Sequence, residues 1–539
     1  MKASDLMVKC LLNEDVEYIF GLPGEENIEF LDSLSSSSIK FITTRHEQGA
    51  AFMADVYGRI KQKAGVCLST LGPGAMNLTT GIASANLDHS PLVAITGQAD
   101  FKGRHFEQHQ YVDVVKSFEP ITKWNARITS ADSIPELVRR AFRVAQMEKP
   151  GATHLELAND IAGEEVESLG PLHKHPLFVS HPIHKDIQAA AELINKSKYP
   201  IIISGNGVIR TNSSDALLKF AEAAQIPVVK TFMSKGSVPS KHPFSIGIFG
   251  LKSRDFIMHE LEKADCVVTV GYDVIEYSPK FWNSKMDKTI IDIDTVPVQN
   301  RDRYYDFCLE LVGDLRFTLT ELSKIVNKKT HWNKETRERI ERAKNDYTPS
   351  FPIKPQHFLQ SIRKAMSDSD ILVSDVGMHK LWISRLFETY KPNTVVISNG
   401  FASMGIALPG AIGAKIAKPD CNVISVSGDG GFLMNIQELE TAKRLGISGV
   451  HIIWTDNSYG MIEWHQAIKH KKKFGVEFTN PDFMLLAKSF GIKGYKVEKA
   501  SELSDILSTA IKSGELCLVE VPIDYSENKN ITFDPSSSN

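Results

Sequence analysis

The chain has 539 residues, a formal net charge of −3 and a hydrophobic fraction of 42%. A charge so near zero argues against nucleic acid as a partner, and the hydrophobic fraction can supply cores for about three domains of ~150–200 residues each. No apolar run approaches the ~20 residues that span a bilayer, and no signal-peptide pattern precedes the first amphipathic helix, so we expect a cytoplasmic protein with no membrane partner.

The first block, residues 1–165, alternates apolar runs with helical patterns, and three of its runs end in glycine-rich or polar turns. The runs and their turns are Val16 to Phe20 before Gly21-Leu22-Pro23-Gly24, Phe41 to Thr43 before Glu47, and Val66 to Leu71 before Gly72-Pro73-Gly74-Ala75-Met76-Asn77. Parallel strands bring their C-terminal ends to one edge of a sheet, so we expect these three turns to converge. An isolated Glu47 would be an ordinary first-turn acid of a helix, but the neighbouring turns make it a candidate ligand-binding group.

The second block, residues 185–325, follows a linker rich in proline and histidine at residues 170–184. It opens with a predicted helix from Ile187 to Ile194 and contains predicted strands at Pro200 to Ser204, Cys266 to Val270 and Thr289 to Asp292. A charged helical stretch, residues 327–344, leads towards the third block, residues 355–530, and we expect the tail from residue 533 to be disordered. The sequence therefore predicts an α/β protein of three domains, each a doubly wound parallel sheet.

The third block carries two acidic turns at the ends of two predicted strands. The strand Asn422 to Ser427 precedes Gly428-Asp429-Gly430-Gly431, and helical spacing follows from Leu433 to Leu445. The strand Val450 to Trp454 delivers Asp456 in the turn Thr455-Asp456-Asn457-Ser458-Tyr459-Gly460-Met461. Glycines let backbone N–H groups close on a phosphate, and paired carboxylates supply the oxygen ligands that Mg²⁺ prefers beside a diphosphate. The alternative is a plain strand-turn-helix with solvated acids, which the second acidic turn disfavours.

This pair of turns resembles the cofactor motif of thiamine diphosphate enzymes. In that family the residues matching Asp429 and Asp456, and the backbone carbonyl of Ser458, bind Mg²⁺. The resemblance implies further cofactor contacts from the two turns, at Gly428, Gly430, Gly431, Tyr459, Gly460 and Met461. Most members have asparagine at the position of Asp456. Aspartate there is a departure seen mainly in catabolic acetolactate synthases, and it adds one negative charge.

The N-terminal turns resemble the pyrimidine-binding domain of acetolactate synthases. In that family the glutamate matching Glu47 hydrogen-bonds N1′ of the aminopyrimidine of the cofactor, which is acid-base work by a buried carboxylate. Gln110 matches a glutamine on the substrate side of the thiazolium ring, and we assign it, with its neighbour His109, to the catalytic site. The resemblance implies further cofactor contacts from Pro23, Pro73, Asn77, His379, Ser403 and Met404. His379 is expected near the diphosphate, and Met404 beneath the bent cofactor.

Long matches to the catabolic branch include residues 271–282 and 519–526. They imply a synthase that decarboxylates pyruvate, or a related 2-oxo acid, and joins the remaining two-carbon unit to a second pyruvate, giving 2-acetolactate and CO₂. Two alternatives stay open: another thiamine diphosphate-dependent 2-oxo acid decarboxylase, carboligase or pyruvate oxidase, and a catalytically silent subunit of the same fold. The adjacent histidine pair of pyruvate-type decarboxylases is absent, and intact Glu47, Asp429 and Asp456 argue against a silent subunit.

The resemblance also sets expectations for flavin and assembly. Flavin-dependent relatives carry an Arg-Phe-Asp-Asp-Arg run where this chain has Tyr272-Asp273-Val274-Ile275-Glu276-Tyr277. We therefore predict thiamine diphosphate and Mg²⁺ as cofactors, and no FAD. A substrate-selecting tryptophan of those relatives matches His465, so a preference for 2-oxobutyrate is not implied. In the family the glutamate-bearing domain of one subunit faces the acidic turns of another, which predicts a homodimer or homotetramer with the cofactor at the interface.

Overall fold

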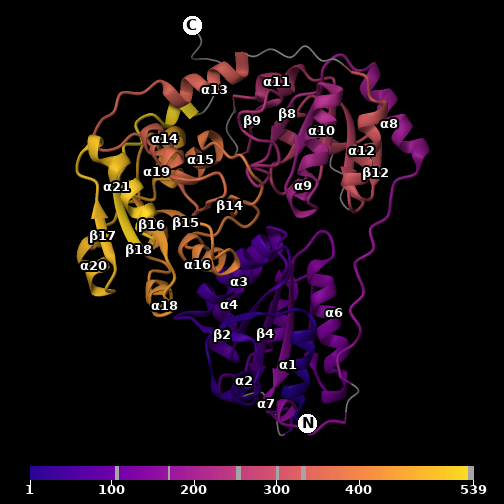
Figure 1. Cartoon of the computed structure of the whole chain (residues 1–539), viewed down its shortest axis with the longest axis vertical. Helices are drawn as coiled ribbons and strands as arrows, with labels where there is room; N and C mark the ends of the chain where they lie inside the picture. Colours follow the sequence, from indigo (N-terminus) through magenta and orange to yellow (C-terminus); the bar gives the residue numbers. More distant parts are fainter. Residues whose placement is uncertain (103–107, 168–169, 251–255, 299–302, 329–334, 532–539) are drawn as a thin grey trace.

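The structure is a computed structural model that describes residues 1–102, 108–167, 170–250, 256–298, 303–328 and 335–531. Figure 1 shows three α/β domains: the N-terminal domain in indigo, the middle domain in magenta and the C-terminal domain in orange to yellow. Each is built around a six-stranded sheet whose paired strands are parallel, as the sequence predicts. In the part of the chain that is described, no helix is long and apolar enough to cross a membrane.

The N-terminal sheet has the strand order β2-β1-β3-β4-β6-β5. Its strands are β1 Tyr18–Gly21, β2 Lys40–Thr43, β3 Gly65–Ser69, β4 Leu92–Gln98, β5 Trp124–Ile128 and β6 Ala152–Ala158. Its helices are α1 Ala3–Asn13, α2 Ile28–Ser35, α3 Glu47–Lys61, α4 Gly72–Leu87, α5 Val114–Phe118, α6 Ile134–Gln146 and α7 Asn159–Ala162. The strand order reverses between β1 and β3, and ligands of such sheets bind at the C-terminal ends of the strands that flank this reversal. Two of the three predicted turns, residues 21–24 and 72–77, follow these strands.

The middle sheet has the order β12-β11-β10-β7-β8-β9. Its strands are β7 Pro200–Ser204, β8 Val228–Lys230, β9 Ser245–Ile248, β10 Cys266–Val270, β11 Thr289–Asp294 and β12 Leu309–Val312. In chain order, the helices of this part of the chain are α8 His184–Lys196, α9 Gly207–Arg210, α10 Ser214–Ala224, α11 Met258–Lys263, α12 Leu315–Ile325 and α13 Glu335–Asn345. Counted within the domain and read from the other edge, the strand order is 3-2-1-4-5-6, which is that of dinucleotide-binding folds.

The C-terminal sheet has the order β14-β13-β15-β16-β18-β17, which repeats the pattern of the N-terminal sheet. Its strands are β13 Ile371–Ser374, β14 Val395–Ile397, β15 Val423–Gly428, β16 Gly449–Thr455, β17 Lys493–Lys496 and β18 Leu516–Pro522. Its helices are α14 Pro355–Ala365, α15 Met378–Leu386, α16 Ala407–Ala417, α17 Asp429–Phe432, α18 Glu438–Arg444, α19 Gly460–His470, α20 Phe483–Ser489 and α21 Leu503–Lys512. Here the order reverses between β13 and β15.

One predicted helix is wrong over its first part. We expected a helix from Leu433 to Leu445, but α17 ends at Phe432 and α18 begins only at Glu438. The Asn435 side chain between them donates to the carbonyl of Gly405 at 2.9 Å. Asparagine side chains bond readily to backbone groups and are unfavourable inside a helix. The break between α17 and α18 therefore lies where Asn435 makes this bond. The predicted tail lies outside the described residues.

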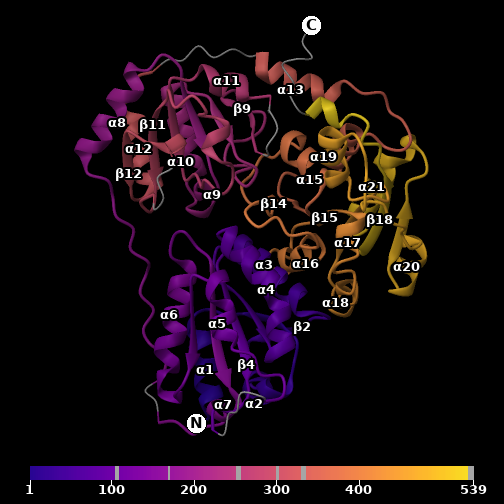
Figure 2. The ribbon, with the colours of Figure 1, turned by 180° about the vertical axis from the view of Figure 1, so that it is seen from behind.

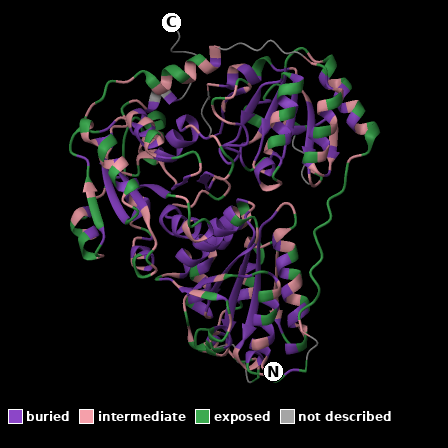
Figure 3. Ribbon diagram, in the orientation of Figure 1, coloured by how far each residue is buried: buried purple, intermediate pink, exposed green. Residues whose placement is uncertain are grey.

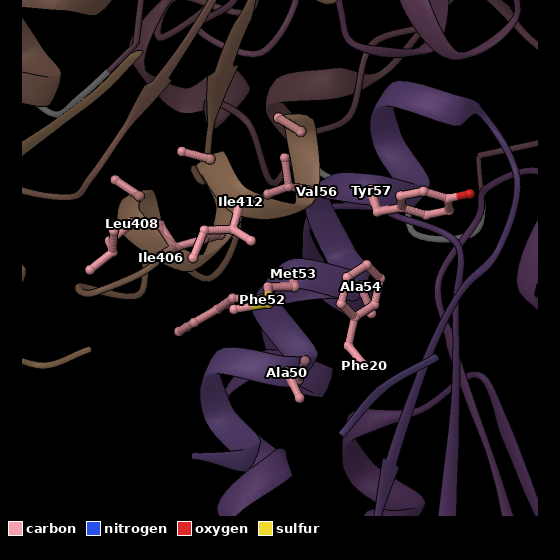
Figure 4. Packing of buried hydrophobic residues seen from close by; sticks show 14 of the residues in the cluster. Phe20, Ala50, Phe52, Met53, Ala54, Val56, Tyr57, Ile406, Leu408 and Ile412 are labelled. Atoms are coloured by element: carbon pink, nitrogen blue, oxygen red, sulfur yellow. The ribbon is translucent and has the colours of Figure 1, made fainter. Parts of the chain in front are cut away.

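The N-terminal and C-terminal domains share a core through α3 and α16, which lie side by side in Figures 1 and 2. Figure 4 shows apolar side chains of α3 packed with those of α16 and of the residue before it: Ala50, Phe52, Met53 and Val56 with Ile406, Leu408 and Ile412. Gly413 permits this approach, because a Cβ there would lie 2.3 Å from the carbonyl oxygen of Met53. Each large buried side chain contributes about 1.5–3 kcal/mol, so the contact holds the two domains together.

The middle domain is joined to the N-terminal domain by an extended segment. Figures 1 and 2 show it running along the outside of the N-terminal domain to α8. Figure 3 shows the segment in the colour of exposed residues and the sheets in the colour of buried ones. Residues 171–181 are exposed without exception. The segment is therefore a connection between cores, as its proline-rich composition predicts.

Candidate cofactor site

The two acidic turns lie at neighbouring strand ends in the C-terminal sheet, because β15 and β16 are adjacent and parallel. The side chain of Asp429 is buried, and its Oδ2 accepts N–H bonds from Asp456 at 3.2 Å and Asn457 at 2.8 Å. The Asn480 side chain donates to the same oxygen at 2.7 Å. These donors hold the Asp429 carboxylate against the second turn.

The electrostatics of this pair favour a cation. Burial, and then the charge of Asp429, raise the pKa of Asp456 to about 7. A divalent ion between the carboxylates would relieve both costs, and Mg²⁺ often takes few protein carboxylates beside phosphate oxygens. No group of three or more acidic, histidine or cysteine side chains among the described residues could hold a metal. The other ligands must therefore come from a backbone carbonyl such as that of Ser458, from water or from a bound diphosphate, and the donor set fits that combination.

Two glycines of the first acidic turn, Gly430 and Gly431, lie too close to neighbouring side chains to carry a Cβ without a shift. A Cβ on Gly430 would lie 2.8 Å from the Tyr459 ring, and one on Gly431 would lie 2.8 Å from the Asp375 carboxylate. In the second turn, a Cβ on Gly460 would lie 2.8 Å from Oδ2 of Asp456. The turns therefore leave their backbone close to the acidic pair, where N–H groups can approach a phosphate.

His379 lies beside the first turn. A Cβ on Gly428 would be 3.4 Å from its ring. Burial lowers the pKa of His379 to about 3, so the ring is neutral. Its Nε2 is buried and has no hydrogen-bond partner among the residues that the structure describes. An orphaned ring nitrogen here fits a diphosphate oxygen as its partner.

A second loop reaches the same edge of the sheet. Ser403 and Met404 are half-buried in the turn before α16, and Gly405 follows with a φ of +88°, which favours glycine. The Asp375 carboxylate, at the end of β13, accepts the N–H of Gly405 at 2.8 Å. Together with the bond from Asn435 to the Gly405 carbonyl, this contact fixes the turn that carries Met404. In the second acidic turn, Met461 packs against the core of the C-terminal domain.

The N-terminal turns converge as predicted. Glu47 is the first residue of α3 and is 5% exposed. Its Oε2 accepts an N–H bond from the Asn77 side chain of α4 at 3.0 Å, and a Cβ on Gly74 would lie 3.2 Å from its Oε1. Pro73 lies in the first turn of α4, and Pro23 is exposed in the turn after β1.

His109 and Gln110 are both exposed, and they lie at the end of a segment whose first part, residues 103–107, is outside the described residues. Gln110 has a φ of +54°. A Cβ on Gly72 would lie 2.3 Å from its carbonyl oxygen, so its backbone lies against the turn that begins α4. The structure thus brings Gln110 next to the Glu47 group of turns.

The hydrogen bonds of Glu47 and of Asp429 stay within their own domains in the described part of the chain. In the described ranges, no hydrogen bond joins Glu47 to Asp429 or Asp456. Three further residues support the site through side-chain bonds and are not among the predicted site residues: Asn480, Asp375 and Asn435. Of these, only Asp375 carried a signal, because it follows the apolar run Ile371 to Val373 closely and stands four residues before His379.

Comparison with known proteins agrees with this geometry. Residues 1–117, 187–322 and 375–521 match the N-terminal thiamine pyrophosphate-binding domain, the central domain and the C-terminal thiamine pyrophosphate-binding domain of thiamine pyrophosphate enzymes. Thiamine pyrophosphate is another name for thiamine diphosphate.

Similar proteins extend over nearly the full chain. An acetolactate synthase of Bacillus subtilis is 36% identical over 99% of this chain and 95% of its own length. A catabolic acetolactate synthase of Raoultella terrigena is 34% identical over 97% of this chain and 95% of its own, and a putative thiamine pyrophosphate-containing protein of Bacillus subtilis is 31% identical over 97% and 91%. Because the three family domains cover most of the chain and these similar proteins match it over nearly its full length, the chain belongs to the thiamine pyrophosphate enzymes.

Proposed function

We propose that this protein is an acetolactate synthase that depends on thiamine diphosphate and Mg²⁺. In this reaction two pyruvate anions and one proton give one 2-acetolactate anion and CO₂. The observation that carries the proposal is the occurrence of buried Glu47, and of buried Asp429 beside half-buried Asp456, at matching edges of two sheets with the same strand order. The similarity to acetolactate synthases over nearly the whole chain supports the choice of substrate.

Each residue group has a separate task in this proposal. The cofactor, when bound, supplies a thiazolium ring that accepts the electrons released by decarboxylation of a 2-oxo acid. Asp429, Asp456 and the Ser458 carbonyl would hold Mg²⁺, while His379, in the neutral tautomer that carries its proton on Nε2, would donate to the diphosphate. Glu47, oriented by Asn77, would hold a proton at N1′ of the pyrimidine. Gln110 would face the substrate.

Product analysis tests the activity. The purified protein is incubated with pyruvate, thiamine diphosphate and Mg²⁺, and pyruvate loss is compared with acetolactate, measured as acetoin after acid treatment. We expect one acetolactate for two pyruvates. Acetaldehyde as the main product would indicate a decarboxylase, and acetate or acetyl phosphate with peroxide would indicate an oxidase. No pyruvate loss in a protein that binds the cofactor would favour a silent subunit.

We also propose that the protein works without FAD. The middle sheet has the dinucleotide-binding order, and its loop after β7 is the place where such folds hold a pyrophosphate. Here the buried carboxyl group of Glu276 accepts the N–H of Asn206 in that loop at 2.9 Å. Because the Glu276 carboxyl group already accepts the N–H of Asn206, and is negatively charged when ionised, it opposes the binding of a phosphate at this loop. FAD released in stoichiometric amount on denaturation of the purified protein would contradict this proposal.

The proposed active unit is a homodimer, alone or paired into a tetramer. Support comes from α19, which begins within the second acidic turn, and from the lack of any hydrogen bond between Glu47 and the acidic pair in the described part of one chain. None of the residues of α19 is buried, and Ile462 and Ile468 are 52% and 64% exposed. A second copy that brings its Glu47 to this edge would complete the site under closed symmetry.

A further inference from the structure

A buried carboxylate of the C-terminal domain lies against the backbone that leads into Glu47. Glu438, the first residue of α18, is fully buried. Its Oε1 accepts N–H bonds from Arg45 at 3.2 Å and from His46 at 3.1 Å, and its Oε2 lies 3.3 Å from the same Arg45 nitrogen. These residues are 393 and 392 positions apart in the chain. Because Arg45 and His46 immediately precede Glu47, the contact joins the two domains at the start of α3.

The fit at this contact is close. A Cβ on Gly49 would lie 2.6 Å from Oε1 of Glu438, so the first turn of α3 must present a glycine to the carboxylate. The hydroxyl of Thr441 donates to Oε2 at 2.7 Å and orients the side chain from its own helix. On the other side, Nδ1 of His46 accepts the N–H of Gln48 at 3.1 Å and caps α3. The free N–H groups at a helix start favour a negative charge in this position.

We propose that Glu438 is a positioning residue for Glu47. It fixes the backbone at residues 45 and 46 from the domain that carries the acidic turns, and thereby sets the direction of the Glu47 side chain. This role rests on the proposed function, because it assumes that Glu47 moves a proton at the cofactor. The bonds themselves do not depend on that function, so they can be tested without turnover.

Asp88 provides a matched comparison, because it makes the opposite contact. It caps the end of α4 in the N-terminal domain, and its Oδ1 accepts N–H bonds from Asn399 at 3.1 Å and Gly400 at 2.6 Å in the C-terminal domain. Its Oδ2 accepts a bond from the Arg59 guanidinium at 2.7 Å. Asp88 is equally buried and also joins the domains, but it supports the loop that leads to Met404 and not the start of α3.

Four variants test the proposal, with kcat, thiamine diphosphate affinity by tryptophan quenching, and melting temperature measured for each. Glu438→Ala should lower kcat about ten- to hundredfold, the scale of a small misplacement of a catalytic group, and change the cofactor affinity less than about twofold. Glu438→Gln should restore most of kcat, because its amide oxygen can accept both N–H bonds. Asp88→Asn should instead weaken cofactor affinity. Asp505→Asn, an exposed first-turn acid of α21, should change neither.

A direct readout is hydrogen exchange at the amides of Arg45 and His46, which should be faster in Glu438→Ala than in the parent and unchanged in Asp505→Asn. The proposal is overturned if exchange at these two amides is the same in Glu438→Ala as in the parent. It is also overturned if Glu438→Ala and Asp88→Asn both lower the same quantity, kcat or cofactor affinity, in proportion to their loss of melting temperature. A parent that binds the cofactor but forms no acetolactate would refute the proposed function alone, and the exchange measurement would still decide the contact.

Discussion

At the scale of single residues, Glu47 is the group on which the chemistry depends most. Its burial and its bond from Asn77 fix one orientation of the carboxylate. Glu47→Gln keeps the shape of the side chain but cannot take up a proton. We expect kcat to fall at least ~10²-fold, the usual scale for acid-base catalysis, while thiamine diphosphate still binds. Steady-state kinetics and calorimetry measure the two effects, and near-normal turnover would refute the role.

Asp456 should tolerate an amide but not the loss of its oxygen. Because burial and Asp429 raise its pKa to about 7, the second negative charge is costly before a metal binds. In Asp456→Asn an oxygen ligand remains and this repulsion is removed, so most activity should be kept. Asp456→Ala and Asp429→Ala should both lose Mg²⁺ and thiamine diphosphate together. Calorimetry at fixed Mg²⁺ compares them, and tight cofactor binding by Asp456→Ala would exclude Asp456 as a ligand.

Glu276 should make stability depend on pH. Burial, and then the charge of Asp273, raise its pKa from 4.5 to about 7. Between these two pH values the Glu276 carboxyl group is protonated in the folded state and ionised in the unfolded state. The free energy of unfolding therefore falls as pH rises through this window. Glu276→Gln has no charge to gain at this position, so between pH 5 and 8 its free energy of unfolding should fall by about 1–3 kcal/mol less than that of the parent. Melting temperatures of both proteins at the two pH values check this, and equal losses would contradict the raised pKa.

The residues that the sequence could predict are those next to a strand end. Glu47, Asp429 and Asp456 each follow an apolar run, so chain order alone places them at a sheet edge. Asn480 and Glu438 have no such signal, because their partners lie 51 and 393 positions away in the chain. Contacts of that kind depend on how loops and domains pack, which the local pattern of one segment does not encode.

At the scale of elements, buried parallel strands are predictable because both of their faces are covered and their residues form continuous apolar runs. The predicted strands at Pro200 to Ser204 and Cys266 to Val270 coincide with β7 and β10. Helix continuity is less predictable, as the break before Glu438 shows. There the apolar spacing continues while the backbone is held by a bond from Asn435 to another loop.

The contact between α3 and α16 yields a prediction for a glycine. In Gly413→Ala the new Cβ would lie 2.3 Å from a backbone oxygen of α3, so the helices must separate. Overpacking of this kind costs about 1–3 kcal/mol. Gly163→Ala is the control, because its nearest neighbour would be 3.9 Å from the new Cβ. In thermal unfolding, only Gly413→Ala should have a melting temperature clearly below that of the parent. Equal melting temperatures would contradict the close packing.

At the scale of the whole molecule, the proposed dimer predicts complementation between two inactive variants. If each site takes Glu47 from one chain and Asp429 from another, a mixed dimer of Glu47→Gln and Asp429→Ala contains one intact site. Random pairing on co-expression should then give roughly a quarter of the parental activity. Each variant expressed alone is the control. If light scattering detects mixed dimers and they remain inactive, the site is not shared between chains.

The exposed connection at residues 171–181 bears on how this protein could be encoded. It contributes nothing to the three sheets, whereas the N-terminal domain is held to the C-terminal domain through α3 and α16. The covalent link is therefore dispensable once the pieces have met. Two open reading frames, divided within this segment, should yield polypeptides that assemble into the same molecule. The gene could therefore be split here, or another module inserted, without moving Glu47 and its neighbouring turns or the Asp429–Asp456 pair.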